Sequence, residues 1–515
     1  MKRQTIRCAS AALLGLALAV LLVWLGATAP ARAGPNTTCV NQSGTGCDAV
    51  CGGGCFASVQ AAIDAALPGG EVRIAGGTYT DPGGTVAAIT KSLILRGGYD
   101  PACAALNPTL YHTMLDGQWG GSVVSITNAG EVLLEHLTLT HGDGSGNCGS
   151  NYGCGGGVYA TGTDLRMGDC VITNSKGSAS GGARGGGFYA YAHGHTVEMW
   201  GSHVVSNTAA PASSASTEYG YGGGIYIEGG TVSLWENEIL DNVGSVNHGG
   251  SGGIHLSDVA SADVLTNTIR GNKANVSIYW SGGGGLYIIY SSAVYVAGNR
   301  IEGNWAASLA GYGGGAYVYK SDAHLARNLI VSNTTGTMNG YGGGVYVFST
   351  TPVTLSNNLI VRNSAATSGG GVCVSRSAAP ASRAILVNNT IADNGDTGVV
   401  ASQYAVLTMT NNIVAGHTTG LTVGQILTGT IVADHNLFWN TSDPITGSNA
   451  IVGDPLLTAD YHLRTGSPAA DAGLTIPWLT TDLEGNSRPQ GSAYDLGAYE
   501  GVTAAVFLPL VVRNR

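Results

Sequence analysis

Charged side chains are scarce in this sequence, because Asp, Glu, Lys and Arg together make up only 10% of its 515 residues. The formal net charge is −10, so the chain lacks the basic surface with which proteins hold nucleic acid. After residue 33 no stretch reaches 18 apolar residues, and no transmembrane span is expected in the mature chain. The sequence also lacks a 3.6-residue apolar period, which argues against helical repeats.

The first 33 residues predict a secretory signal peptide. Lys2, Arg3 and Arg7 precede an apolar run from Ala11 to Gly26, and Ala31-Arg32-Ala33 supplies the small residues that signal peptidase reads. We therefore expect a secreted or cell-surface protein. Cleavage leaves 18 basic against 32 acidic residues, so a neutral glycan is a more natural partner than an anionic one, unless Ca²⁺ bridges the charges. No other metal or cofactor is predicted.

Nine cysteines follow the signal peptide. In an exported protein, clustered cysteines favour disulfides. The clusters are an N-terminal group and a pair that flanks a later loop: Cys39, Cys47, Cys51 and Cys55, then Cys148 and Cys154. A zinc site is the alternative for the N-terminal group, although no histidine lies nearby. The odd number leaves one thiol unpaired, for which Cys170 and Cys373 are the candidates.

Glycine, by contrast, is abundant, with 82 residues, and many of these glycines recur in phase. A glycine run followed by a short β-prone stretch repeats about every thirty residues. The last glycine of each run stands at positions 157, 187, 224, 253, 285, 315, 344, 371 and 398. Such a period is the signature of a repeat architecture.

A second motif, Asn-x-Ile-x-x-Asn, keeps step with the first. It is found at residues 237–242, 267–272, 299–304, 328–333, 358–363 and 389–394. Asparagine suits sharp bends because it tolerates left-handed backbone angles, and stacked asparagines can hydrogen-bond to one another along the axis.

One period contains three short strands, expected at residues 225–227, 231–235 and 238–240. Strands this short bury little by themselves, but successive coils can pair in parallel and enclose one continuous core. The sequence therefore predicts an all-β fold, a right-handed parallel β-helix. A helix over residues 56–67, with Ser58 as its N-cap, is expected to cover the N-terminal end.

The resulting domain prediction divides the chain into five parts. A Cys-rich segment at 34–55 follows the signal peptide of residues 1–33, and the β-helix spans 56–440 with its regular coils at 155–398. Residues 441–500 are expected to close the other end, and 501–515 form an apolar tail, interpreted either as an anchoring tag or as a last strand.

Two segments carry a family resemblance. Ser58-Val59-Gln60-Ala61-Ala62-Ile63-Asp64, Pro68-Gly69-Gly70 and Gly76-Gly77-Thr78-Tyr79 resemble the entry of pectin-lyase-like right-handed β-helix proteins. Asp482, Gly485, Arg488 and Asp495-Leu496-Gly497-Ala498-Tyr499-Glu500 resemble the choice-of-anchor Q region of exported proteins. The resemblance implies architecture and envelope anchoring through the C-terminal region. It does not imply an activity, since this fold carries lyases, hydrolases and non-catalytic adhesins.

No catalytic signature of these enzymes is present. The polygalacturonase motifs Asn-Thr-Asp, Asp-Asp, Gly-His-Gly and Arg-Ile-Lys do not occur, and His193-Gly194-His195 has the inverse order. The acidic cluster with which pectate lyases bind Ca²⁺ is not evident either. An enzyme is therefore disfavoured, although β-helix active sites leave weak linear traces.

The first strand of each repeat places one residue outward between two inward aliphatic residues. That position is occupied by six tyrosines and one histidine: Tyr159, Tyr189, Tyr226, His255, Tyr287, Tyr317 and Tyr346. Exposed aromatic rings in a column could stack on sugar rings. Alternatively, the tyrosines only stabilise the sheet.

Two ionisable residues interrupt this outer surface on adjacent coils, Glu228 and His255. As an acid–base pair they are the candidate catalytic residues. The first hypothesis is a non-catalytic surface protein that binds polysaccharide or a cell-surface glycan through the tyrosines. The alternatives are an extracellular polysaccharide lyase or glycoside hydrolase, and a structural envelope protein without ligand.

Overall fold

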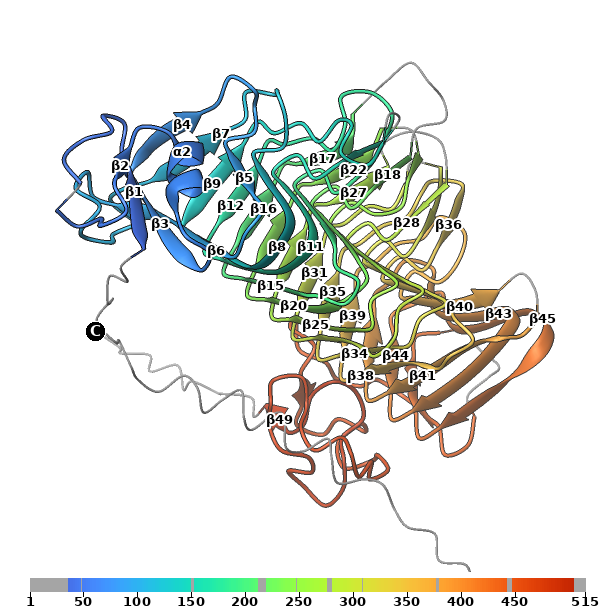
Figure 1. The fold of residues 1–515 in the computed structure, drawn as a ribbon. Coiled ribbons are helices and arrows are strands. Elements are labelled where there is room, and N and C mark those ends of the chain that lie inside the picture. The colour runs from blue at the N-terminus through green and yellow to red at the C-terminus, as the bar shows by residue number, and fades with distance from the viewer. Residues whose placement is uncertain are drawn as a thin grey trace, which may run out of the picture.

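The structure is a computed structural model that describes residues 36–503, except 48, 150–151, 212–218, 247, 276–279, 308, 377–378 and 442–446. The predicted signal peptide and most of the apolar tail lie outside the described residues. Within them the chain is a solenoid of stacked coils, and all of its named strands pair in parallel (Figure 1). None of the described helices is long and apolar enough to cross a membrane.

The largest sheet has 23 strands and forms two faces of the solenoid. The first face contains β5 (Ala87–Ile89), β14 (Phe188–Tyr191), β19 (Ile225–Glu228), β24 (Ile254–Ser257), β29 (Leu286–Ile289), β33 (Ala316–Tyr319), β37 (Val345–Phe348) and β40 (Val372–Arg376). The second face contains β1 (Thr37–Val40), β2 (Cys55–Phe56), β3 (Gly70–Ala75), β6 (Leu93–Tyr99), β15 (Thr196–Trp200), β20 (Thr231–Trp235), β25 (Ser261–Leu265), β30 (Val294–Ala297), β34 (Ala323–Ala326), β38 (Val353–Ser356) and β41 (Ser382–Val387). Four long strands continue through both faces: β8 (Val124–Glu135), β11 (Val158–Gly168), β43 (Thr397–Thr410) and β45 (Thr419–Asp434).

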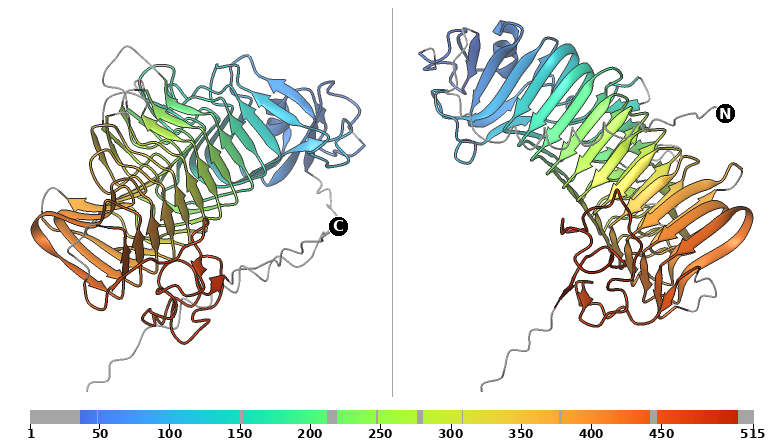
Figure 2. Two further views of the ribbon diagram at one scale, coloured as in Figure 1. Left: turned by 180° about the vertical axis from the view of Figure 1, so that it is seen from behind. Right: turned by 90° about the horizontal axis from the view of Figure 1, so that it is seen from below.

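The third face is a sheet of 14 strands (Figure 2). They are β4 (Gly77–Thr80), β7 (Thr113–Asp116), β9 (Leu137–Thr140), β12 (Val171–Thr173), β16 (His203–Val205), β21 (Glu238–Leu240), β26 (Thr268–Arg270), β31 (Arg300–Glu302), β35 (Leu329–Val331), β39 (Leu359–Val361), β42 (Thr390–Ala392), β44 (Ile413–Ala415), β46 (Leu437–Trp439) and β47 (Ile451–Val452). The three strands expected at 225–227, 231–235 and 238–240 are therefore confirmed as β19, β20 and β21. Their inward Ile, Val and Leu side chains belong to one continuous buried core.

A seven-stranded sheet, here called the flanking sheet, precedes the glycine runs. It consists of β10 (Tyr152–Cys154), β13 (Gly182–Arg184), β18 (Tyr219–Tyr221), β23 (His248–Gly249), β28 (Trp280–Gly282), β32 (Ala310–Tyr312) and β36 (Asn339–Tyr341). A small sheet of β17 (Thr208–Ala210), β22 (Val243–Ser245) and β27 (Lys273–Asn275) lies in the same loops. Positive φ at the first glycine of a run, such as 63° at Gly222, lets the chain turn sharply from β18 into β19.

Two asparagine ladders run along the axis. Along each ladder the Asn Nδ2 donates to the Oδ1 of the equivalent asparagine one coil further on, as from Asn237 to Asn267 and from Asn272 to Asn304, both at 3.0 Å; one ladder ends where Asn394 meets His417. These asparagines do not have positive φ; the left-handed residue is the one before them, for example Asp241 with φ 52°. The expected hydrogen bonding is confirmed, whereas the expected left-handed backbone at the motif asparagines is wrong.

The cap helix and the number of unpaired cysteines differ from expectation, whereas the expected disulfides are present. Helix α2 (Val59–Ala65) is shorter than the expected 56–67, with Ser58 as its N-cap as predicted. The disulfides join Cys39 to Cys51, Cys47 to Cys55 and Cys148 to Cys154. Three described cysteines rather than one are unpaired and buried, and they are Cys103, Cys170 and Cys373.

The C-terminal cap, residues 454–503 with β48 (Leu463–Arg464) and β49 (Val502–Thr503), does not close the end of the stack. It lies beside the last coils, where Tyr461, Leu496 and Tyr499 pack on the outer side of β39, β42, β44 and β46 (Figures 1 and 2). The expectation of an end cap is wrong because the third face carries outward apolar residues there, such as Val361 and Ile413, which the cap buries.

Candidate functional site

The tyrosine column is in register as predicted. Tyr159, Tyr189, Tyr226, His255, Tyr287, Tyr317 and Tyr346 are paired position by position along the first face. Most neighbouring rings stack, for example Tyr189 on Tyr226 with centroids 5.7 Å apart and Tyr287 on Tyr317 at 4.7 Å, whereas His255–Tyr287 and Tyr317–Tyr346 meet edge to face. The column faces away from the core of the coils.

The expected exposure of this column is wrong. Tyr226 and Tyr346 are 5% and 6% exposed, Tyr189 and Tyr317 are also buried, and only Tyr159 and Tyr287 are half-buried. The flanking sheet covers them: Tyr312 of β32 packs on Tyr346 with ring centroids 4.9 Å apart. Burial accordingly raises the pKa of Tyr226 to about 12. Rings covered in this way offer no face on which a sugar could stack.

A sequence signal for this cover existed. Tyr221, Tyr312 and Tyr341 stand immediately before glycine runs, in step with the column, and the sharp turn at those glycines folds them back over it. Both sets of tyrosines are therefore parts of one packed aromatic layer outside the first face.

Glu228 and His255 do not form an acid–base pair. Arg184 of the flanking sheet donates to Glu228 at 2.9 Å and lies over the ring of Tyr226. The His255 imidazole is buried, with Nδ1 3.1 Å from Ser251 Oγ, and burial lowers its pKa to about 3. The two side chains therefore have separate structural partners.

A first prediction follows from His255. An unfolded histidine has a pKa near 6.5, so between pH 6.5 and about 3 the unfolded chain binds a proton that the folded chain does not. The free energy of unfolding must fall as the pH falls through this window. His255→Gln should reduce this acid sensitivity, measured as the difference in urea midpoint between pH 7 and pH 4. His203→Gln, at an exposed site beside Glu238, is the control; equal acid sensitivity of His255→Gln and wild type would contradict the prediction.

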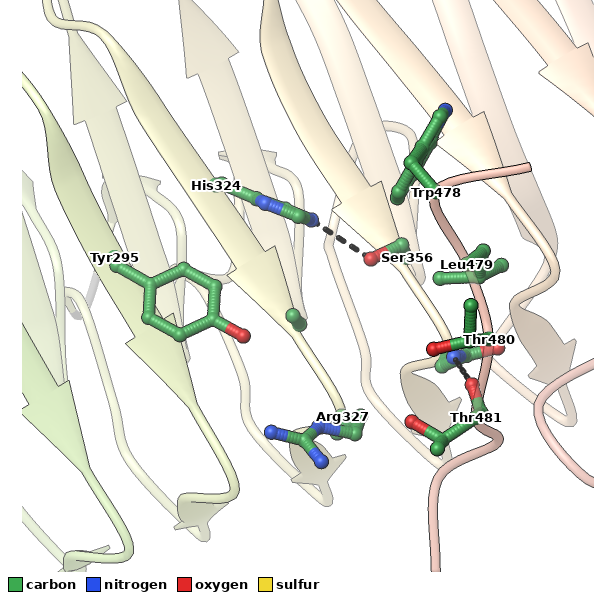
Figure 3. Close-up of a pocket in the computed structure, with 10 residues that line it drawn as sticks. Tyr295, His324, Arg327, Ser356, Trp478, Leu479, Thr480 and Thr481 are labelled. Carbon is green, nitrogen blue, oxygen red and sulfur yellow. Dashed lines mark hydrogen bonds between the residues drawn. The ribbon is translucent and has the colours of Figure 1, made fainter. Parts of the chain in front are cut away.

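An open groove lies elsewhere, at the seam between the second face and the cap (Figure 3). Its first part, a cavity of about 180 Å³, is lined by outward residues of β30, β34 and β38 and by cap residues 478–481. A second cavity of about 270 Å³ lies between the corners of the coils and cap residues 483–485. Arg327 lines both, so the two cavities adjoin. We call them together the seam groove.

Aromatic rings project into the first part of the seam groove. Trp478 is 55% exposed, and its ring lies edge-on to His324 with centroids 5.9 Å apart. Tyr295 pairs in register with His324 on the neighbouring coil, at 5.4 Å between rings. His324 Nε2 is 2.7 Å from Ser356 Oγ, and burial, with a smaller effect of Arg327, lowers the pKa of His324.

Sequence reasoning missed this site. Tyr295 and His324 occupy the outward position of the second strand of their repeats. The alternation that predicted the tyrosine column would have predicted their outward direction as well. Trp478 carries no linear signal, because it reaches the groove only through the docking of the cap.

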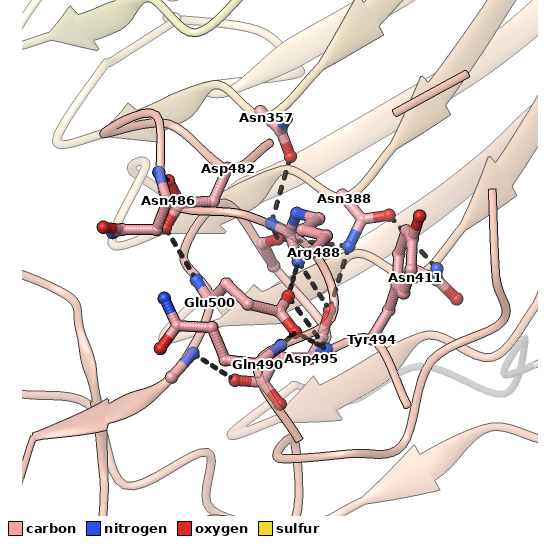
Figure 4. Close-up of polar contacts among 12 residues, drawn as sticks. Asn357, Asn388, Asn411, Asp482, Asn486, Arg488, Gln490, Tyr494, Asp495 and Glu500 are labelled. Carbon is pink, nitrogen blue, oxygen red and sulfur yellow. Dashed lines mark hydrogen bonds and ion pairs between the residues drawn. The ribbon is translucent and has the colours of Figure 1, made fainter. Parts of the chain in front are cut away.

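A buried polar network holds the cap wall of the groove in place (Figure 4). Arg488 forms an ion pair with Glu500 and donates to Asn357 Oδ1 at 3.0 Å. Asn357 in turn donates to Thr481 O at 2.6 Å. Asn357, Asn388 and Asn411 are left-handed corner residues of successive coils, and all three bond to the cap. The motif residues that resemble a choice-of-anchor region thus have a structural role here.

The described residues contain one group of three that could approach a metal, Cys39, Cys47 and Cys103. Two of these sulfurs are already in disulfides, so the zinc alternative does not fit the cysteine pairing. Bridging of an anionic glycan to the protein by Ca²⁺ stays a prediction.

Comparison with known proteins supports the fold. The family described as "Right handed beta helix region" matches residues 214–382 and 275–437, which confirms the expected handedness. No curated protein matches the chain. Among solved structures, the crystal structure of the pectate lyase Pel9A aligns over 87% of this chain and 91% of its own, at 13% identity and a TM-score of 0.38. A likeness this distant carries no argument, so the support for the fold comes from the family match.

Proposed function

We propose that this right-handed parallel β-helix is an exported, cell-surface carbohydrate-binding protein that holds a glycan in the seam groove. The observation that carries the proposal is the exposed ring of Trp478 beside the half-buried rings of Tyr295 and His324, all three of which line one groove. Ring faces beside hydroxyl and amide groups, here Ser356 and Thr480, suit the alternating apolar and polar surfaces of a sugar.

Binding without catalysis is the better-supported form of this function. Glycoside hydrolysis ordinarily requires two carboxyl groups on either side of the scissile bond. The residues that line the seam groove include one, Glu484, and its carboxylate is 3.0 Å from His462. A lyase or hydrolase remains the alternative function, and release of reducing sugars or unsaturated products from a polysaccharide panel would establish it. A chain that binds no glycan would instead be the structural envelope protein.

Trp478→Ala tests the groove directly. Loss of one stacking ring costs about 1–2 kcal/mol of binding, or about a 5- to 30-fold loss of affinity, measured by calorimetry on the best oligosaccharide of a panel. The melting temperature should stay near that of wild type because the ring is largely exposed. Tyr191→Ala is the matched control, since it removes an exposed ring from the first face. If Tyr191→Ala weakens binding and Trp478→Ala does not, the glycan lies on the first face and the proposal fails.

A further inference from the structure

A third cavity, of about 310 Å³, lies on the other flank of the cap. Its floor comes from the third face, where Ala392, Ala415 and Trp439 occupy paired positions on three successive coils. Its opposite wall is cap residues 454–461. The two alanines are buried, whereas the Trp439 side chain beside them is 41% exposed.

The polar residues of this cavity are held in fixed orientations. Asp393 and Asn440 are left-handed corner residues that directly follow the strands of Ala392 and Trp439. Tyr461 donates from its hydroxyl to Asp393 Oδ2 at 2.9 Å, and Arg362 Nε donates to the same hydroxyl oxygen at 3.1 Å. The contact of Tyr461 with Asp393 thus orients one carboxylate oxygen toward the cap.

Asp393 Oδ1 lies over Gly416, which also lines the cavity. A Cβ at Gly416 would come within 2.2 Å of this oxygen, and Gly416 has a φ of 72°, so a larger residue would displace the carboxylate. Asp454 stands on the opposite wall, where its Oδ1 accepts the N–H of Leu456 at 2.8 Å. Carboxylates therefore line the cavity on both its sheet side and its cap side.

We infer that the Trp439 cavity is a second carbohydrate site, specific for a neutral sugar. The indole offers an apolar face for the ring, and Asp393, Asp454 and Asn440 accept hydrogen bonds from sugar hydroxyls. Two carboxylates line the cavity, whereas Arg362, the cation that contacts Tyr461, is not among the lining residues, so the cavity would repel a uronate or a sulfated sugar. The seam groove differs, since Arg327 lines it. This inference rests on the proposed function for carbohydrate as the ligand class.

Hydroxyl-radical footprinting with mass spectrometry tests both sites in one sample of the full exported chain. Trp439 and Trp478 lie on different tryptic peptides because Arg464 separates them. The probes are cellohexaose, xylohexaose and mannohexaose as neutral glycans, and hexagalacturonate as an anionic one. At least one neutral probe should lower modification of Trp439 threefold or more, whereas hexagalacturonate should leave it unchanged. Trp119, exposed near the other end of the solenoid, should be unaffected throughout.

The outcomes separate the two claims. Protection of Trp478 without any protection of Trp439 overturns the second site and leaves the seam groove. Protection of Trp439 alone supports the second site and overturns the seam groove, and protection of neither removes both. Equal protection of Trp439 by hexagalacturonate overturns the assignment to neutral sugars. Asp393→Asn, which retains an acceptor for Tyr461, should keep the fold and weaken neutral-glycan protection of Trp439 severalfold.

Discussion

Replacing Arg488 with methionine is expected to lower the free energy of unfolding of the C-terminal cap by about 3–5 kcal/mol, the cost of breaking a buried ion pair from one side. Arg488 and Glu500 are both almost fully buried. The variant would leave the Glu500 carboxylate without its cation, and it would remove one of the two side-chain donors, Arg488 and Asn388, that the carbonyls of Asp495 and Gly497 share. The bond from Arg488 to Asn357, which ties the cap to the coils, would also be lost.

Hydrogen exchange of residues 454–503, measured by mass spectrometry, should show this change as faster exchange of the whole cap with little effect on the first coils. Arg464→Met is the matched control, because Arg464 lies in the same cap and is exposed; it should stay within about 0.5 kcal/mol of wild type. Slow, wild-type-like cap exchange in Arg488→Met would show that the network does not hold the cap. The same variant should weaken glycan binding in the seam groove, since the cap supplies Trp478.

Replacing Asn304 with alanine should cost about 2–4 kcal/mol of stability in the middle of the solenoid. Asn304 is fully buried and its Nδ2 donates to Ile269 O at 2.8 Å and to Asn333 Oδ1 at 2.9 Å. Its Oδ1 accepts both the backbone N–H and the side-chain amide of Asn272, at 3.0 Å each. Alanine would leave these buried groups unpaired, and the urea midpoint followed by circular dichroism should fall accordingly.

Two further variants separate hydrogen bonding from backbone preference. Asn304→Gly should be no more stable than Asn304→Ala, because the left-handed residue is Gly303 rather than Asn304. Asn304→Asp should be at least as damaging as alanine, since aspartate keeps the shape but cannot donate to Asn333. Asn339→Ala, at an exposed position, should be nearly neutral. If Asn304→Gly proved as stable as wild type, the asparagine would stabilise the fold through its backbone conformation and not through the hydrogen bonds of its side chain.

The fold was predictable at the level of the repeat. The glycine runs and the Asn-x-Ile-x-x-Asn motif predicted the three strands at 225–227, 231–235 and 238–240, and the Ser58 N-cap predicted the start of helix α2. These features depend on residues close together in the sequence, or on equivalent residues one coil apart. The position of the cap was not predictable in this way, because it depends on apolar residues contributed by four separate coils.

The candidate site was less predictable than the fold. The alternation of side chains along a strand correctly predicted that Tyr226 and its equivalents point away from the core. It did not predict which residues cover them. Tyr295 and Trp478 are brought into one groove although 183 residues of sequence separate them. Glu228 and His255 do not line that groove. Glu228 pairs with Arg184, and His255 contacts Ser251.

The sequence by itself determined the period, the parallel register and the direction in which each side chain leaves its strand, because these follow from repetition and from the two-residue alternation of a strand. Only the tertiary structure decided which outward side chains remain in water. The flanking sheet folds over the first face and the cap docks on the third face, and exposure depends on such long-range packing rather than on any local pattern.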